Sequence, residues 1–235
     1  MKNIKAAIEA KKEYLKNKSV DFTQKIKEFG FNNTEEFAYE EAVFFIKNTE
    51  FDIEKISDII NEKNKGIDAI NQKKNKIFIV IPDDTYIWWN GKTEFNKEYC
   101  DLNKLKIVYQ PYNGGVICTN KEDLCVAFIA YDMPNITKFV LLDNICKWIN
   151  NNISNKAYVS GNDILVDNKK VASYGHSVFE NGMSIITLQI SFKIDMDIIN
   201  NVCIKKKEKE PTGLKEYNKN ISRDSLINEV VSWLN

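Results

Sequence analysis

Residues 161–175 read "GNDILVDNKKVASYG", and this stretch has the pattern of a β-hairpin that carries polar groups. Two short apolar runs flank the pair Asp167-Asn168, and such residues are common in two-residue hairpin turns because they tolerate positive φ angles. Asp163 precedes the first run and Lys170 begins the second. The stretch predicts a hairpin with a carboxylate and an ammonium, and it raises the question whether this hairpin is one wall of an active site.

The composition indicates a folded protein without a dedicated surface for polyanions. The chain has 235 residues, of which 43% are hydrophobic and 11% aromatic, enough to bury a substantial core. Its 33 basic and 33 acidic residues cancel, which argues against a nucleic-acid or membrane-surface protein. Arg223 is the only arginine, so chemistry that needs a planar guanidinium has almost no residue to supply it.

Cysteine usage and the N-terminal sequence point to the cytoplasm. The five cysteines are odd in number and form no Cys-x-x-Cys pair, which fits reduced thiols better than a disulfide framework or a zinc site. The N-terminus "MKNIKAAIEAKKEYLK" has charges where a signal peptide needs an apolar run, and no apolar run has the length of a membrane span. We therefore expect a cytoplasmic protein without a membrane partner.

The order of elements predicts an α+β fold. Residues 2–29 read as helical, and a second helix is expected over residues 35–48, directly after Thr34. We expect residues 51–75 to be helical at first and then an insertion or long connection. From Lys76 onward, strands come mostly as hairpins with helices between them, which favours a mixed, largely antiparallel sheet with flanking helices. A final helix follows Ser222, a suitable N-cap residue.

Three short motifs, in this order and at this spacing, resemble those of one superfamily. They are "YNGGV" at 112–116, "GNDILV" at 161–166 and "KVASYG" at 170–175, and "EPTGLKEY" follows at 210–217. The pattern resembles the catalytic domain shared by lipoate-protein ligases, biotin-protein ligases and octanoyltransferases. The resemblance covers residues 37–235 apart from 51–75, and it implies a biotinyl/lipoyl protein ligase-like fold with residues 1–36 as an N-terminal helical extension.

The resemblance implies a function in protein lipoylation or biotinylation. A ligase or acyltransferase of this kind attaches lipoate, octanoate or biotin to a lysine of a lipoyl- or biotinyl-type carrier domain through an activated acyl intermediate. A ligase would bind ATP and Mg²⁺. By the same resemblance Lys170 is the catalytic ammonium and Asp163 helps to hold Mg²⁺. The residues expected to bind the nucleotide and acyl group are Asn113, Gly114, Gly115, Asn162, Asp163, Ser173 and Gly175.

Two departures from the family pattern affect the expected chemistry. The family has an arginine before the glycines, but this chain has Gln110 and Asn113 there, and neutral amides cannot neutralise a phosphate. Cys203 lies where octanoyltransferases carry their cysteine nucleophile, so it is a candidate thioester-forming residue with Lys170 as its partner. The alternative is that Cys203 only fills space at a strand end, and the lone His176 is open to a similar packing role.

Two other functions fit parts of the sequence. A catalytically inactive relative could use the fold as a binding or interaction module, which the missing arginine favours. A DNA-binding regulator could use residues 22–42 as a helix-turn-helix, but the second helix carries several glutamates that would repel phosphates. The basic run 205–209 reads as a solvated loop that could steer an acidic carrier domain.

Overall fold

The computed structural model describes residues 2–17, 22–61, 72–110, 115–131, 133–153, 156–204 and 209–235, and a seven-stranded sheet organises them. The first pair of strands in this sheet is parallel and all other neighbours are antiparallel, so the expected mixed, largely antiparallel sheet is confirmed. From edge to edge the strands are β1 (Glu50–Lys55), β2 (Lys76–Ile81), β6 (Leu124–Ala130), β10 (Ser184–Ile190), β9 (Lys169–Val178), β8 (Asp163–Val166) and β7 (Ala157–Ser160).

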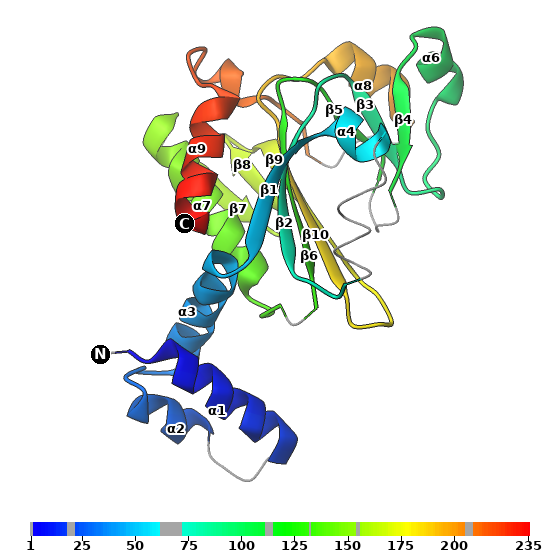
Figure 1. The fold of residues 1–235 in the computed structure, drawn as a ribbon. Coiled ribbons are helices and arrows are strands. Elements are labelled where there is room, and N and C mark those ends of the chain that lie inside the picture. The colour runs from blue at the N-terminus through cyan, green and yellow to red at the C-terminus, as the bar shows by residue number, and fades with distance from the viewer. Residues whose placement is uncertain are drawn as a thin grey trace.

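Helices cover one face of the large sheet, as Figure 1 shows for α7 and α9. α7 (Thr137–Asn152) and α9 (Arg223–Leu234) each bury one face in the core. The C-terminal half of α3 (Thr34–Lys47) also packs there, with Ala42 and Ile46 buried. Alternate residues of the strands, among them Ile77 and Ile79 of β2, face these helices, because successive side chains of a strand point to opposite sides. The α+β class expected from the sequence is therefore confirmed.

A small second sheet packs against the other face. It has the order β4 (Lys106–Tyr109), β3 (Tyr86–Trp89) and β5 (Ile117–Thr119). Phe78, Val80 and Ile185 of the large sheet form a buried cluster with Tyr86 of the small one. The expected strand, turn and strand of residues 76–89 is confirmed, and its two strands enter different sheets.

Four short helices complete the described part of the fold. They are α4 (Ile56–Asn61), α6 (Lys97–Leu102), α8 (Met196–Val202) and the 3₁₀ helix η1 (Leu214–Glu216).

Arg223, the single arginine of the chain, connects the start of the last helix to backbone carbonyls of two loops. Arg223 stands at the start of α9, where the hydroxyl oxygen of Ser222 accepts a hydrogen bond from the amide of Ser225 at 3.2 Å, so the expected cap is confirmed. The Arg223 guanidinium donates to the carbonyl oxygens of Lys121 at 2.5 Å and Pro82 at 3.3 Å. It therefore ties the C-terminal helix to loops of both sheets.

The N-terminal helices form a cluster that extends away from the sheets (Figure 1). α1 (Ile4–Asn17) and α2 (Phe22–Glu28) pack with the first turns of α3 around Phe31 and Phe37. Lys11 pairs with Glu41 at 2.6 Å, which satisfies a carboxylate that is almost buried. Because α3 belongs to this cluster at one end and to the main core at the other, the domain boundary at residues 36–37 stays a prediction.

Two local expectations were wrong. The N-cap of α3 is Asn33, whose side chain accepts from the amide of Glu36 at 2.8 Å, so the helix already includes Thr34. Residues 50–55 form β1 and not a helix, because Phe51 and Ile53 alternate with acidic residues and β1 finds a parallel partner in β2. Residues 62–71, the middle of the expected connection, lie outside the described part of the chain.

Candidate active site

The hairpin of residues 163–178 has the predicted turn. Asp167 has φ 49° and Asn168 has φ 65°, so both central residues are left-handed, as a type I′ turn requires. Lys169 then pairs with Val166 across the turn. The prediction that these residues form a tight hairpin is confirmed.

A β-bulge in this hairpin decides where Lys170 points. Lys170 pairs with Leu165, but Ala172 pairs with the residue before Leu165, so Val171 is an extra residue in β9. Val171 and Ala172 are both buried in the core under the helices. Without the bulge, the odd spacing between Lys170 and Ser173 would put them on opposite faces of the sheet. The extra residue brings Lys170 to the face that Ser173 occupies.

Asp163 lies between two lysines on that face. Its Oδ1 accepts a hydrogen bond from the Ser173 hydroxyl at 3.1 Å and lies 3.9 Å from the Lys170 ammonium. Its Oδ2 is 2.8 Å from the ammonium of Lys209, which also donates to the carbonyl oxygen of Ser160 at 3.1 Å. The Asp163 side chain is only 17% exposed, so these charges interact with limited screening by water.

Sequence reasoning missed Lys209 as part of this cluster. The sequence places Lys209 in the basic run 205–209, which reads as a solvated loop. Residues 205–208 of that run lie outside the described part of the chain. Lys209 itself contacts Asp163 across 46 residues of sequence. In the sequence, Lys209 stands directly before the "EPTG" segment. This position indicates a place in the site only once the segment is known to pack on β9.

The segment Glu210–Gly213 closes over the start of β9. The Lys170 amide donates to the Glu210 carbonyl oxygen at 2.8 Å, and the Thr212 amide donates to the Lys170 carbonyl oxygen at 2.8 Å. A Cβ at Gly213 would stand 2.6 Å from the Phe192 carbonyl oxygen, so the segment can approach this closely only with glycine there. The backbone of Lys170 is therefore held on both sides, by β8 and by this segment.

A row of paired polar residues links this cluster to the glycine turn. Gln189 of β10 pairs with Ser173 of β9, which pairs with Asp163 of β8, and directly paired residues point to the same face. The Gln189 amide donates to the Cys118 carbonyl oxygen of β5 at 3.0 Å. Gly115 comes three residues before Cys118, and a Cβ there would meet no atom within 4 Å. β5 thus contacts the sheet face that carries Lys170, and Gly115 comes two residues before β5.

Of the other residues expected in the site, the structure describes Asn162 and Gly175 but not Asn113 and Gly114. Asn162 is exposed in the turn before β8, and its carbonyl oxygen accepts from the Tyr174 amide at 2.8 Å. Gly175 pairs with Thr187, on the same face as Ser173. Asn113 and Gly114 lie outside the described residues, and Gln110 is almost fully buried. The binding roles expected for these residues stay predictions.

His176 lies on the opposite face of β9. It alternates with Gly175 and so shares the face of Tyr174, which belongs to the core under α7. Burial lowers the pKa of the His176 imidazole, and the nearby Lys138 ammonium lowers it further. This placement favours the packing role over a catalytic one.

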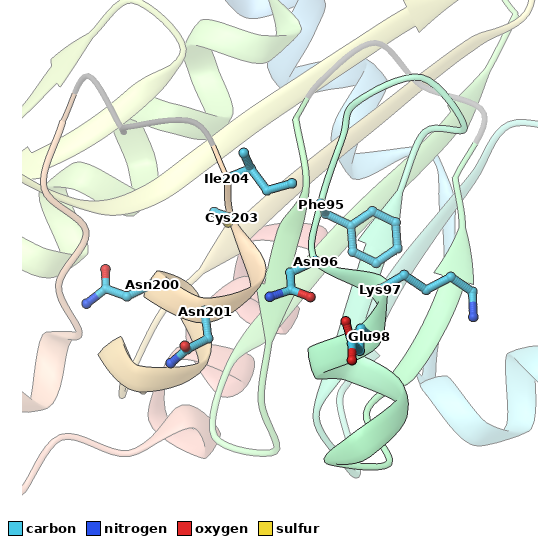
Figure 2. A pocket seen from close by; sticks show the side chains of 8 residues that line it. All are labelled: Phe95, Asn96, Lys97, Glu98, Asn200, Asn201, Cys203 and Ile204. Carbon is cyan, nitrogen blue, oxygen red and sulfur yellow. The ribbon is translucent and has the colours of Figure 1, made fainter.

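Cys203 lines a hollow between α6 and α8, shown in Figure 2. Its backbone forms an antiparallel bridge with Phe95, and the Asn96 amide donates to the Val202 carbonyl oxygen at 3.0 Å. The hollow has a volume of about 560 Å³. Its walls mix amide, charged and apolar side chains, and Asn200 and Asn201 lie across from Asn96 in the figure. The nucleophilic role expected for Cys203 stays a prediction.

The described residues do not form a resident metal site. They contain no group of three His, Cys, Asp or Glu side chains that could hold a metal ion. Asp163, the expected Mg²⁺ ligand, faces two ammonium groups, and their charges compete with a cation for the carboxylate.

Among the described residues, no helix is both long and apolar enough to cross a membrane.

Comparisons with known proteins rest on structure alone, because no family model and no curated protein matches the sequence. P. falciparum LipL1, solved in complex with lipoate, superposes with a TM-score of 0.60 over 79% of this chain at 15% identity. The chain has the fold of the lipoate-protein ligases. It spans 61% of the LipL1 chain, and at this identity the likeness extends to the fold and no further.

Two further lipoate-protein ligase structures agree with this fold. The bipartite ligase of Thermoplasma acidophilum, solved as part of a lipoylation system with its E2 lipoyl domain, gives a TM-score of 0.59 at 14% identity. The match covers 79% of this chain and 82% of the Thermoplasma chain. A lipoate-protein ligase A bound with ATP gives a TM-score of 0.54 at 13% identity. The match covers 79% of this chain and 83% of that ligase's chain. The lipoate-protein ligase fold expected from the three motifs is therefore confirmed.

Proposed function

We propose that this protein attaches a lipoyl-type acyl group, lipoate or octanoate, to a lysine of a carrier domain through an acyl-adenylate. One observation carries the proposal: the bulge in β9 turns Lys170 to the face of the large sheet that carries Asp163 and Ser173, where Gln189 contacts β5. The similar ligases support the reactants, because one was solved with lipoate, one with ATP, and one as part of a lipoylation system with its E2 lipoyl domain. Biotin is the competing acid that the experiment below includes.

The reaction has two half-steps. A carboxylate oxygen of the acid attacks the α-phosphorus of ATP, the bond to pyrophosphate breaks, and the acyl-adenylate forms. The amine of the carrier lysine then attacks the acyl carbonyl carbon, AMP leaves with the bonding electron pair, the amine nitrogen releases a proton to water, and an amide is formed. Both steps build negative charge on oxygens of the phosphate or carbonyl, so a positioned cation accelerates them.

Lys170 is the proposed catalytic cation. Its main chain is fixed by β8 and by the Glu210–Gly213 segment, and Asp163 holds its ammonium on the face of the sheet that carries the site. A group held in place before the reaction stabilises developing charge without reorganisation at that moment. Gly115, with open space where a Cβ would stand, allows a backbone amide to approach the ligand closely.

A transfer assay tests the function. The protein is incubated with ATP, Mg²⁺ and one acid (lipoate, octanoate or biotin) together with a lipoyl domain, and mass spectrometry follows the mass of that domain. We expect an added lipoyl or octanoyl group, and Lys170→Ala should lower the rate about a hundredfold or more. Lys169→Ala is the matched control, because Lys169 pairs with the exposed Glu210 next to the same strand. Transfer that persists in Lys170→Ala would contradict the assignment.

The inactive relative remains the second candidate, and the missing arginine favours it. Gln110, at that position, is buried, and its backbone amide donates to the Trp89 carbonyl oxygen at 2.8 Å. A thermal shift separates the two candidates, since a ligand that binds only the folded state raises its melting temperature. Stabilisation by ATP with lipoate supports the ligase. No response to ATP, to any of the three acids or to octanoyl-carrier protein supports a binding module.

A further inference from the structure

A side chain of the large sheet holds β5 of the small sheet beside the candidate site. Gln189 of β10 is half-buried, and its Nε2 donates to the Cys118 carbonyl oxygen, in the middle of β5, at 3.0 Å. Another contact between the sheets is apolar, because Ile185 of the same strand lies in a buried cluster with Tyr86 of β3. The Gln189 bond fixes direction as well as distance, since a hydrogen bond weakens steeply when its angle is poor.

A buried carboxylate orients the Gln189 amide. Asp123 lies in the turn between β5 and β6 and accepts from the main-chain amides of Asn120 and Phe192, both at 3.1 Å. Burial raises the pKa of Asp123 to about 7, and its hydrogen bonds, one of them with the Gln189 side chain, act in the opposite direction. A side-chain amide has two N–H donors, so Gln189 serves the Cys118 carbonyl and the Asp123 carboxylate together.

The bond to β5 starts from the face of the proposed reaction centre. Gln189 pairs with Ser173 of β9, whose hydroxyl donates to Asp163 Oδ1 at 3.1 Å. Directly paired residues share a face, so Gln189 reaches β5 from the face that carries Asp163 and Lys170. The main chain of Lys170 is fixed separately, by β8 and by the Glu210–Gly213 segment. A change at Gln189 therefore moves β5 and leaves Lys170 in place.

We propose that Gln189 is a positioning residue that holds β5 over the site face for the binding of ATP. This inference rests on the proposed function. Gln189 acts through β5 and does not touch the reacting atoms, and Gly115, two residues before β5, is among the residues expected to bind the nucleotide. Loss of the bond to Cys118 weakens the binding of ATP and leaves the step assigned to Lys170 nearly unchanged.

Transfer kinetics at varied ATP concentration test the proposal. Gln189→Leu keeps the size of the side chain and removes the donor, so we expect a KM for ATP about tenfold higher and a kcat within about threefold of wild type. Gln189→Glu has no donor while it is ionised and gains one when it is protonated. Its KM, divided by that of wild type, should fall as the pH is lowered from 8 to 6, and Gln189→Leu should show no such recovery.

Asn150→Leu is the matched control. Asn150 of α7 also ties a side-chain amide to a main chain, because it donates to the Ala157 carbonyl oxygen at 3.0 Å and accepts from the Ala157 amide at 2.8 Å. This tie lies on the helix side of the large sheet. The variant should lower the melting temperature and leave the KM for ATP unchanged.

The other outcomes rule against the proposal. If Gln189 is only structural, Gln189→Leu lowers the melting temperature and the kcat, because less enzyme is folded, and the KM for ATP stays the same. If the KM of Gln189→Glu stays high at pH 6, the donor is not what matters. Calorimetry separates these results from a failure of the proposed function. Wild type that binds ATP and transfers no acyl group refutes the function, and the Kd of Gln189→Leu for ATP then decides the role of Gln189. Wild type that binds no ATP overturns both.

Discussion

The two places where the sequence suggested chemistry, the Asp163 cluster and the hollow beside Cys203, are built in different ways. The first combines residues from β8, β9 and the Glu210–Gly213 side of the chain, and its contacts are ion pairs and strand hydrogen bonds. The second lies between two short helices, and its walls mix amide, charged and apolar side chains. The comparison teaches that a reactive residue type alone is a weaker sign of a site than a charged group whose backbone and side chain are both fixed.

The two places also differ in what holds the reactive atom. Lys170 has a carboxylate beside its ammonium, and its amide and carbonyl are bonded to the segment that closes over β9. Cys203 follows α8 directly, and its amide donates to the Ile199 carbonyl oxygen as the helix ends. A catalytic group gains from being positioned before the reaction. We therefore propose the first place for the chemistry, and four variants test this difference.

Of these four variants, Asp163→Asn is expected to have the largest effect. The change removes the carboxylate that faces both lysines, and the new amide can direct its NH₂ group toward an ammonium. A hydrogen bond between charged groups contributes about 1.5–3 kcal/mol, so losing one lowers kcat/KM by roughly tenfold to a hundredfold. The measurement is the rate of carrier lipoylation at saturating ATP and at low ATP. Unchanged kinetics would show that the two lysines do not need Asp163.

Gly213→Ala is expected to have the next largest effect, on stability. The added methyl group meets main-chain atoms of Phe192 and Lys193 at 2.6 and 2.7 Å, so the Glu210–Gly213 segment must move away from the backbone that follows β10. Overpacking of this kind costs about 1–3 kcal/mol. Urea unfolding measures the loss, and Gly182→Ala, at an open turn position, is a comparison in which only backbone strain is added. Equal losses in the two variants would contradict the close approach.

Much of this arrangement could be predicted from local sequence. The Asp167-Asn168 turn, the strands on either side of it and the helix after Ser222 follow from turn and cap chemistry that acts over a few residues. The family motifs led to Lys170 and Asp163 for the same reason, since all lie on one hairpin. The contact between Lys209 and Asp163 could not be predicted, because it depends on a segment that returns to β9 from 46 residues away.

The errors have a common physical cause as well. Residues 50–55 are a strand because β2 offers a parallel partner, and local propensity does not reveal that partner. The bulge at Val171 is likewise invisible in the sequence, although it decides which face Lys170 occupies. Local rules therefore predicted the pieces of the candidate site, and the pairing of distant segments determined how the pieces face each other.

A moderate effect is expected for Asp123→Asn, on the pH dependence of stability. Asp123 supports the β5 side of the site, where its carboxylate accepts from the amides of Asn120 and Phe192, and burial raises its pKa to about 7. Between its unfolded pKa near 4 and pH 7 the folded state binds the extra proton. This contribution to stability is therefore present at low pH and is lost as the pH rises through about 7.

Thermal unfolding from pH 5 to pH 8 measures this slope. Over that range the wild type should lose about 2 kcal/mol that Asp123→Asn does not lose, because asparagine has no proton to release. The variant is expected to be less stable than wild type at pH 5 and closer to it at pH 8. Parallel pH profiles for the two proteins would show that Asp123 keeps an ordinary pKa in the fold.

The smallest effect is expected for Cys203→Ala. In the acyl-adenylate route the carrier lysine attacks the activated acid directly, so no thiol has to carry the acyl group, and the rate of ATP-dependent transfer should stay within about twofold of wild type. The change deletes one sulfur atom at the wall of an open hollow, which leaves stability nearly unchanged. Octanoyl transfer from octanoyl-carrier protein without ATP is the matched measurement. If that reaction occurs and Cys203→Ala abolishes it, the thioester route is the real one, and the hollow beside α8 is the catalytic centre in place of the ATP-dependent site.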